Sequence, residues 1–226
     1  MNLRGVSSIA ILALCLSEKL LGHSPQDIRL DAIEKLELHN LKADVVSYLG
    51  RAAVRIANTE AQDSAYGEGL AIVRGTSLRD GTIEATLAGD TKLDAPPQLR
   101  GFVGIAFRVT DRSHFECFYI RPKNGRSDDQ LQRNHSAQYM SIPGFAWDRL
   151  RSETPGRYES YVDLVPGQWT KLKIAVNGKI AKLYVNGAEQ PTLIVNDLKQ
   201  TLSSGSIALW VGQGTIAHFA DLKVTP

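Results

Sequence analysis

The sequence predicts an all-β protein built as one antiparallel β-sandwich. Short runs of alternating apolar and polar residues recur along the 226-residue chain, with turn signals such as Asn-Gly or Pro-Gly between them. The segment PGQWTKLKIAVNGKIAKLYVNGAE, residues 166–189, shows this best, because Asn177-Gly178 and Asn186-Gly187 each follow an alternating run. Asn-Gly between such runs is typical of a hairpin with a type I′ turn, which needs positive φ at both central residues.

The expected elements begin with a short helical turn at residues 25–35. The expected strands are residues 45–48, 53–56, 69–73, 82–87, 103–109, 115–121, 138–141, 158–163, 169–176, 181–185, 205–211 and 217–224. Antiparallel pairing across the loop of residues 110–114 would place Arg108 opposite Glu116. Trp169 and Trp210 occupy apolar positions of their runs and are expected in the core, whereas His218 is expected at the surface.

The first 24 residues have the pattern of a secretory leader. Arg4 precedes a short apolar run at residues 9–16, which charged residues interrupt before it is long enough to span a bilayer. A buried N-terminal helix is the alternative, and lipid anchoring at Cys15 is less favoured because the preceding Leu14 is large. We therefore expect a domain at residues 25–226, with its core at about 36–226, outside a bacterial cell or in its envelope. Cys117 would then be a buried, inert thiol.

Composition narrows the possible functions. The chain is 43% hydrophobic and carries a formal net charge of +2, so it has the composition of an ordinary globular protein. Nucleic-acid binding needs a concentrated basic surface, and the balanced charge does not indicate one. We expect neither a nucleic-acid partner nor a membrane span, and the sequence leaves the oligomeric state open.

Four segments resemble known proteins: GIAFRVTDRSHFECFYIRP, YESYVDLVPGQW, the hairpin after Trp169, and GSIALWVGQGTIAHFADLKV. Together they resemble the jelly-roll superfamily of concanavalin A-like and laminin-G-like domains, near the 3-keto-disaccharide hydrolase domains. The resemblance covers about residues 65–226 and implies a jelly-roll β-sandwich. It leaves the function open, because the superfamily includes hydrolases, lyases, lectins and scaffolding modules.

A long insertion at about residues 123–157 interrupts the rhythm of strands, and long loops in compact domains are usually functional. Aromatic and charged residues are dense in and around it, a mixture that suits sugars because rings stack on pyranose faces while charged groups bind hydroxyls. The sequence therefore predicts a secreted carbohydrate-binding or glycan-processing domain. The candidate acid/base groups are Glu116, His135 and Glu159, and the candidate sugar-binding residues are Arg108, Arg121, Tyr139, Trp147, Arg149 and Tyr161.

The alternative is a non-catalytic laminin-G-like module that binds a protein or an envelope polymer. It is kept because the sequence holds no complete catalytic motif, so enzymatic activity stays undecided. Trp147 suits ligand contact and loop anchoring equally. No cofactor is expected: Asp90, Asp128 and Asp129 could ligate Ca²⁺, but without the spacing of a calcium loop they are better interpreted as solvated turn acids.

Overall fold

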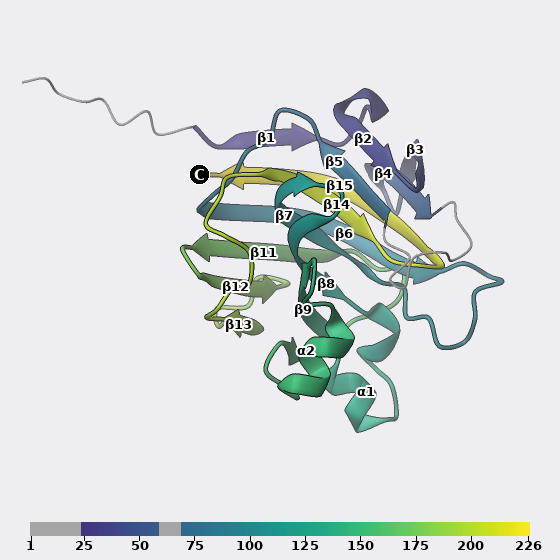
Figure 1. Cartoon of the computed structure of the whole chain (residues 1–226). Helices are drawn as coiled ribbons and strands as arrows, with labels where there is room; N and C mark the ends of the chain where they lie inside the picture. The colour runs from purple at the N-terminus through teal and green to yellow at the C-terminus, as the bar shows by residue number, and fades with distance from the viewer. Residues whose placement is uncertain (1–23, 59–68) are drawn as a thin grey trace, which may run out of the picture.

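The computed structural model describes residues 24–58 and 69–226, which form two antiparallel β-sheets packed face to face (Figure 1). The eight-stranded sheet has the order β13-β12-β11-β6-β15-β4-β3, and β1 pairs with β15. Its strands are β1 (Gln26–Arg29), β3 (Leu41–Tyr48), β4 (Arg51–Asn58), β6 (Gly81–Thr91), β11 (Thr170–Asn177), β12 (Ile180–Val185), β13 (Leu193–Val195) and β15 (Thr215–Thr225). The predicted all-β sandwich is confirmed.

The seven-stranded sheet has the order β10-β9-β8-β7-β14-β5-β2. Its strands are β2 (Leu36–His39), β5 (Gly69–Val73), β7 (Val103–Asp111), β8 (His114–Ile120), β9 (Ala137–Ile142), β10 (Glu159–Ser160) and β14 (Ser206–Val211). The predicted insertion at residues 123–157 therefore contains β9, which is an integral strand of this sheet between β8 and β10.

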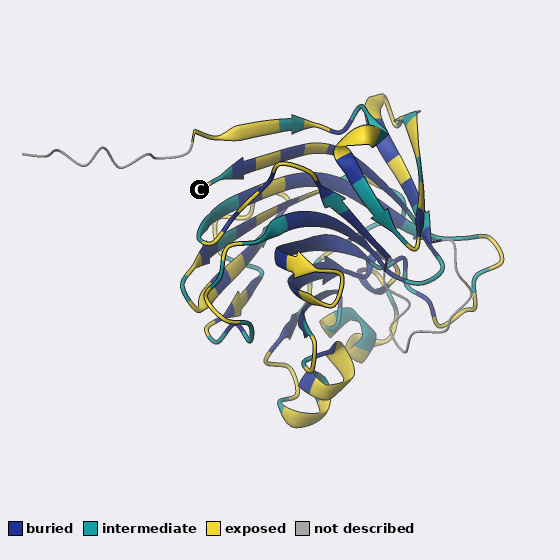
Figure 2. Cartoon of the chain, turned by 45° about the horizontal axis from the view of Figure 1, so that its top comes forward, coloured by how far each residue is buried: buried dark blue, intermediate teal, exposed yellow. Residues whose placement is uncertain are grey.

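In residues 24–58 and 69–226, four short helical segments accompany the sheets: η1 (Ile33–Lys35), η2 (Pro122–Asn124), α1 (Gln130–Asn134) and α2 (Trp147–Glu153). Helices α1 and α2 lie together beyond β9, and most of their residues are exposed or half-buried (Figures 1 and 2). No helix in the described residues is long and apolar enough to cross a membrane.

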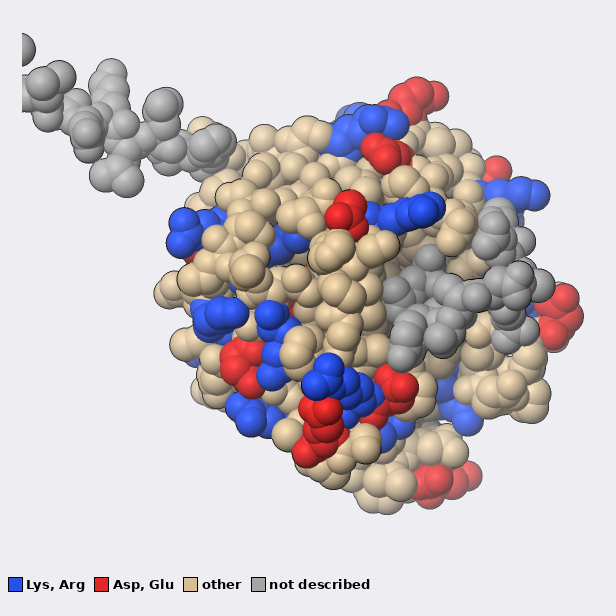
Figure 3. All heavy atoms as spheres, in the orientation of Figure 1, with Lys and Arg blue, Asp and Glu red and all other residues tan. Residues whose placement is uncertain are grey.

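Period-two alternation places apolar side chains between the sheets, where Val54, Phe118, Ile174 and Phe219 are fully buried. The outer face of the seven-stranded sheet carries a second buried cluster, which includes Cys117, Tyr119 and Trp210. Both faces of this sheet are thus apolar along much of its width. On the surface shown in Figure 3, basic and acidic side chains are interspersed.

A group of contacting aromatic side chains lies on the outer face of the eight-stranded sheet. Tyr48, at the end of β3, stacks on His218 of β15 with ring centroids 3.6 Å apart, and its hydroxyl donates to the Gly167 carbonyl at 2.7 Å. Trp169 packs edge-on against Tyr48 at 5.4 Å. The prediction that Trp169 and Trp210 lie in the core is confirmed for Trp210, which is buried in the second cluster, and wrong for Trp169, which is half-buried on the outer face of the eight-stranded sheet. His218 is buried rather than at the surface.

One predicted turn has the expected backbone and one is displaced. Positive φ occurs at both Asn186 and Gly187, as expected, and also at Leu49 and Gly50 between β3 and β4. Asn177, however, pairs with Ile180, so the loop is Gly178-Lys179 and positive φ falls on Gly178. A glycine at the first central position is typical of a type II′ turn rather than the predicted type I′.

The predicted pairing of Arg108 with Glu116 is wrong. Phe107 pairs with Glu116 and Asp111 pairs with His114, so β7 has three residues between these pairs where β8 has one. Arg108 lies inside this bulge with a φ of 52°, and bulged residues lose their direct cross-strand partner.

The N-terminal prediction is right only in part. Residues 26–29 form β1, and only residues 33–35 are helical. The predicted leader, residues 1–24, lies outside the described residues except for Ser24, and so does Cys15. Cys117 is buried, as predicted.

Candidate functional site

Strand β9 separates the predicted site residues, because neighbouring side chains of a strand point to opposite faces of its sheet. Gln138 pairs with Glu159 of β10, and both side chains lie on the outer face. Ser141 pairs with Glu116 of β8, and this pair lies on the inner face. The structure therefore does not bring Glu116 and Glu159 to one side of the sheet.

On the outer face, Glu159 is the centre of a group that we call the Glu159 cluster: Glu159, His135, Arg121 and Arg151. Arg151 donates to Glu159 Oε1 through Nε at 2.9 Å and through a second, shorter contact. Arg121 Nη1 lies 3.8 Å from the same oxygen. His135 Nδ1 lies 2.8 Å from Glu159 Oε2, but the two atoms are not aligned for a hydrogen bond.

Arg121 is fixed by further contacts. It donates to the Tyr119 hydroxyl at 2.8 Å, to Gln138 Oε1 at 3.0 Å and to the His135 carbonyl at 2.8 Å. Its guanidinium also lies over the Tyr119 ring, 5.0 Å from the centroid. A guanidinium with this many partners is held in one orientation, which suits preorganised binding.

The cluster is buried at its centre and open at one edge. The side chains of Glu159 and Arg121 are 2% and 6% exposed, whereas Arg151 is 32% exposed and Trp147 is 37% exposed. The Trp147 ring lies 4.8 Å from the Arg151 guanidinium and 5.9 Å from that of Arg121. Burial, aided by the two arginines, lowers the pKa of His135 against the pull of Glu159.

Helix α2 explains which of its residues reach the cluster. Trp147 and Arg151 are four residues apart and share one face of the helix. Arg149 lies on another face, where it donates to Glu153 at 2.7 Å and to the Gly144 carbonyl at 2.7 Å. Sequence reasoning missed Arg151 because it read this segment as a loop; the helical spacing of Trp147 and Arg151 was the available signal.

Glu116 and Tyr139 form a separate, internal pair. Tyr139 donates to Glu116 Oε2 at 2.5 Å, and the Gln200 backbone N–H donates to Oε1 at 2.8 Å. Both side chains are fully buried, and burial raises the pKa of each. The pair ties β8 and β9 to the loop that follows β13. We do not propose an acid/base role for Glu116 or a sugar contact for Tyr139.

The remaining predicted sugar contacts are also outside the cluster. Arg108 is buried and donates to the carbonyls of Arg79 at 2.9 Å and Gly178 at 2.8 Å, so it braces the turn between β11 and β12. Tyr161 is exposed, and its hydroxyl accepts from Arg133 at 3.1 Å. The structure thus gathers four of the nine predicted residues: Arg121, His135, Trp147 and Glu159.

The three aspartates considered for Ca²⁺ have other surroundings. Asp129 caps α1 by accepting from the Leu131 and Gln132 N–H groups. Asp90 accepts from the Thr91 N–H at 2.7 Å, and Asp128 is exposed. Within the described ranges, no group of three or more His, Cys, Asp or Glu side chains is placed to hold a metal.

The two sheets and their order define a jelly-roll β-sandwich of the concanavalin-like type, and comparison with solved structures agrees. A Bacillus subtilis protein of unknown function with a galectin-like fold has a TM-score of 0.57 at 12% identity, over 90% of this chain and 96% of that one. The carbohydrate-binding module CBM66 of Bacillus subtilis has a TM-score of 0.50 at 14% identity, over 84% and 98%.

A third similar structure is the exoplasmic/lumenal domain of VIP36, in a form bound to Ca²⁺ and Man3GlcNAc. Its TM-score is 0.53 at 12% identity, over 88% of this chain and 86% of that one. No family model and no curated protein matches the chain. At these identities the likeness establishes the fold alone.

Proposed function

We propose that this protein is a secreted carbohydrate-binding domain whose ligand contacts the open edge of the Glu159 cluster. The observation that carries the proposal is the exposed Trp147 ring beside guanidinium groups that buried partners hold in place. An indole face can stack on a pyranose while the outward N–H groups of Arg151 bind its hydroxyls. The fold is shared with a carbohydrate-binding module and with a lumenal domain bound to a mannose-containing glycan, which supports this assignment.

Glycan processing at the same place is the second candidate. The observation that favours it is the 2.8 Å approach of His135 Nδ1 to Glu159 Oε2, two buried atoms without a hydrogen bond. Such a pair can serve as acid and base. Glycoside hydrolysis, however, usually needs two carboxyl groups flanking one bond. Glu116 lies on the other face of the sheet, so binding is the better supported function. The similarity to 3-keto-disaccharide hydrolase domains rests on the sequence segments alone.

A glycan screen that reads both binding and released reducing sugar tests these functions together. We expect a glycan that binds the purified protein and loses about fivefold or more in affinity to Trp147→Ala, because one aromatic stack contributes roughly 1–3 kcal/mol. Arg149→Ala is the matched control, since it changes the same helix on a face turned away from the cluster.

The outcomes separate the candidates. Product release that Glu159→Gln abolishes would establish an enzyme. Equal affinity of Trp147→Ala and Arg149→Ala for every bound glycan would show that the Glu159 cluster only anchors α2. If no glycan bound and no reducing sugar was released, the alternative function would be favoured, a module that binds a protein or an envelope polymer.

A further inference from the structure

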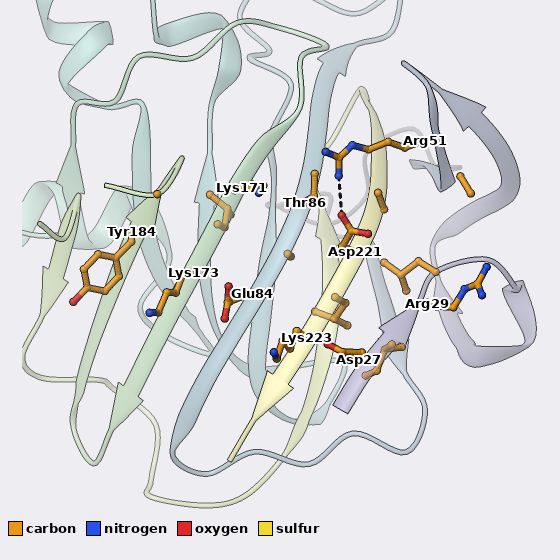
Figure 4. A pocket seen from close by; sticks show the side chains of 18 of the residues that line it. Asp27, Arg29, Arg51, Glu84, Thr86, Lys171, Lys173, Tyr184, Asp221 and Lys223 are labelled. Atoms are coloured by element: carbon orange, nitrogen blue, oxygen red, sulfur yellow. Dashed lines mark hydrogen bonds and ion pairs between the residues drawn. The ribbon is translucent and has the colours of Figure 1, made fainter. Parts of the chain in front are cut away.

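A large and a small hollow lie on the outer face of the eight-stranded sheet. The large one, of about 1110 Å³, is lined mainly from β1, β4, β6, β11, β12 and β15 (Figure 4). Its described lining carries five basic and five acidic side chains, so no net charge selects a ligand there. The small one has a volume of about 240 Å³, and we call it the His218 pocket. The described residues of its lining are Tyr48, Asp90, Thr91, Leu93, Gly167, Ile216 and His218.

His218 gives this pocket a buried imidazole without a hydrogen-bond partner. The residue is 8% exposed and its ring stacks on Tyr48, but no group within residues 24–58 and 69–226 hydrogen-bonds to its ring nitrogens. Burial, with a smaller contribution from Arg55, lowers the pKa of His218 to about 4. At neutral pH the ring therefore offers one N–H donor and one nitrogen acceptor. Buried polar groups are normally hydrogen-bonded, so the partner of this ring is to be sought in the pocket that it lines.

Asp90 and Tyr48 add hydrogen-bond acceptors beside the imidazole. Asp90 of β6 pairs directly with Ile216 of β15, which is two residues from His218 and on the same face of the sheet. Asp90 Oδ1 accepts from the Thr91 N–H at 2.7 Å, whereas no hydrogen bond from the described residues reaches Oδ2. The Tyr48 hydroxyl uses its proton for a backbone carbonyl, so its oxygen is left to accept. The pocket thus holds two acceptors next to a group that both donates and accepts.

The surroundings of the pocket are close to electrically neutral. Lys123 Nζ lies 3.8 Å from Asp90 Oδ1 and compensates the carboxylate. Arg55, the cross-strand partner of His218, forms an ion pair with Asp44 at 2.8 Å. Lys92 donates to a backbone carbonyl at 2.7 Å and does not line the pocket. These charges favour neither an anion nor a cation as the ligand.

We propose that the His218 pocket binds one neutral pyranose ring. Sites for drug-sized ligands usually hold about 300–1,000 Å³, so this smaller pocket suits a single small ring. Neighbouring hydroxyls of a pyranose both donate and accept, which matches a carboxylate oxygen beside a neutral imidazole. Leu93 and Ile216, also in the lining, offer apolar surface to the C–H groups of the ring. This pocket and the Glu159 cluster lie on the outer faces of different sheets, so the proposal does not depend on the sugar site at Trp147.

NMR titration of the full chain with methyl glycosides tests the proposal. The probes are methyl α-glucoside, methyl α-galactoside, methyl α-mannoside and methyl N-acetyl-β-glucosaminide. The readouts are the ring signals of His218 and the backbone amide signal of Gly167, which also lines the pocket. We expect at least one probe to shift both signals saturably. Methyl glucuronide and glucosamine, an anionic and a cationic analogue, should bind more weakly, because the pocket has no net charge to compensate theirs.

Two variants assign the binding to this pocket, with the Gly167 amide as the readout. His218→Phe keeps a ring against Tyr48 but removes both nitrogens, so it should weaken binding about two- to tenfold, the effect of one lost hydrogen bond. Asp90→Ala should weaken binding by about tenfold or more, since hydrogen bonds to a charged group are stronger. The Asp90 side chain is 46% exposed, so this variant should fold. Asp94→Ala removes an exposed acid of the same loop outside the lining and should change the affinity less than twofold.

Three results would overturn the proposal. The first is that no neutral probe causes a saturable shift. The second is that His218→Phe and Asp90→Ala bind as tightly as Asp94→Ala. The third is tighter binding of either charged analogue than of every neutral probe, which would indicate a charge-selective site. Trp147→Ala should leave this affinity unchanged, so failure of one site is distinguishable from failure of the other.

Discussion

Removing the carboxylate of Glu159 should destabilise the protein strongly. The carboxylate is 2% exposed and compensates Arg121, which is 6% exposed, together with the half-buried Arg151. Glu159→Ala would leave the Arg121 guanidinium buried without its counter-ion, and breaking a buried pair in this way costs about 3–5 kcal/mol. For a chain of 150–250 residues, each kcal/mol shifts Tm by about 2–4 °C, so Tm should fall by roughly 6–20 °C.

Thermal and urea unfolding of Glu159→Ala beside Glu153→Ala measures this effect. Glu153 also pairs with an arginine of α2, but its side chain is 53% exposed. Exposed pairs contribute about 0–1 kcal/mol, so the control should stay close to the parent protein. If both variants lost the same stability, the idea that Glu159 neutralises a buried arginine would be refuted.

Two further predictions concern buried polar groups. Tyr139→Phe removes the hydroxyl that donates to Glu116 and accepts from the Lys199 N–H, so it should lower the free energy of unfolding by about 1–3 kcal/mol. Tyr161→Phe, at an exposed hydroxyl, is its control, and equal effects would contradict the reasoning. Burial beneath Tyr48, with a smaller contribution from Arg55, lowers the pKa of His218 to about 4. A histidine in the unfolded chain titrates near pH 6.5. The stabilisation of the folded state by neutral His218 is therefore fully present above that pH. It is lost as the pH falls toward 4, by at most about 3 kcal/mol. His218→Gln should flatten this part of the pH–stability curve, and an unchanged slope would show that another group is responsible.

The sequence predicted most strands, because alternation records which side chains face the core. Residues 69–73 were predicted to the residue as a short apolar run, and four of these five residues are buried. Strand β1 was not predicted because its residues, Gln26–Arg29, are mostly exposed and polar. They form a strand because they pair with β15, which their own sequence does not indicate. The bulge at Arg108 was not predicted either, because no local sequence pattern distinguishes an extra residue in a strand from a longer loop after it.

The site was predicted in composition but not in arrangement. Arg121, His135, Trp147 and Glu159 were singled out because their residue types suit sugars, and they do lie together. Glu116 was predicted as a second carboxyl for acid/base chemistry beside Glu159, yet which face a strand residue occupies depends on the register of β8 with β9. Register is a property of the assembled sheet, so one sequence read segment by segment could not place Glu116 on the other side.

The position of β15 has a consequence for synthesis of the chain. This strand, residues 215–225, lies inside the eight-stranded sheet, with β6 on one side and β4 and β1 on the other. Until it is made, a nascent chain that already holds β4 and β6 leaves their pairing edges open. Open strand edges recruit other chains, and pairings this distant in sequence form slowly. The protein is therefore most prone to aggregate before β15 emerges, and a chain that stops before β15 lacks the strand that joins the two parts of the sheet.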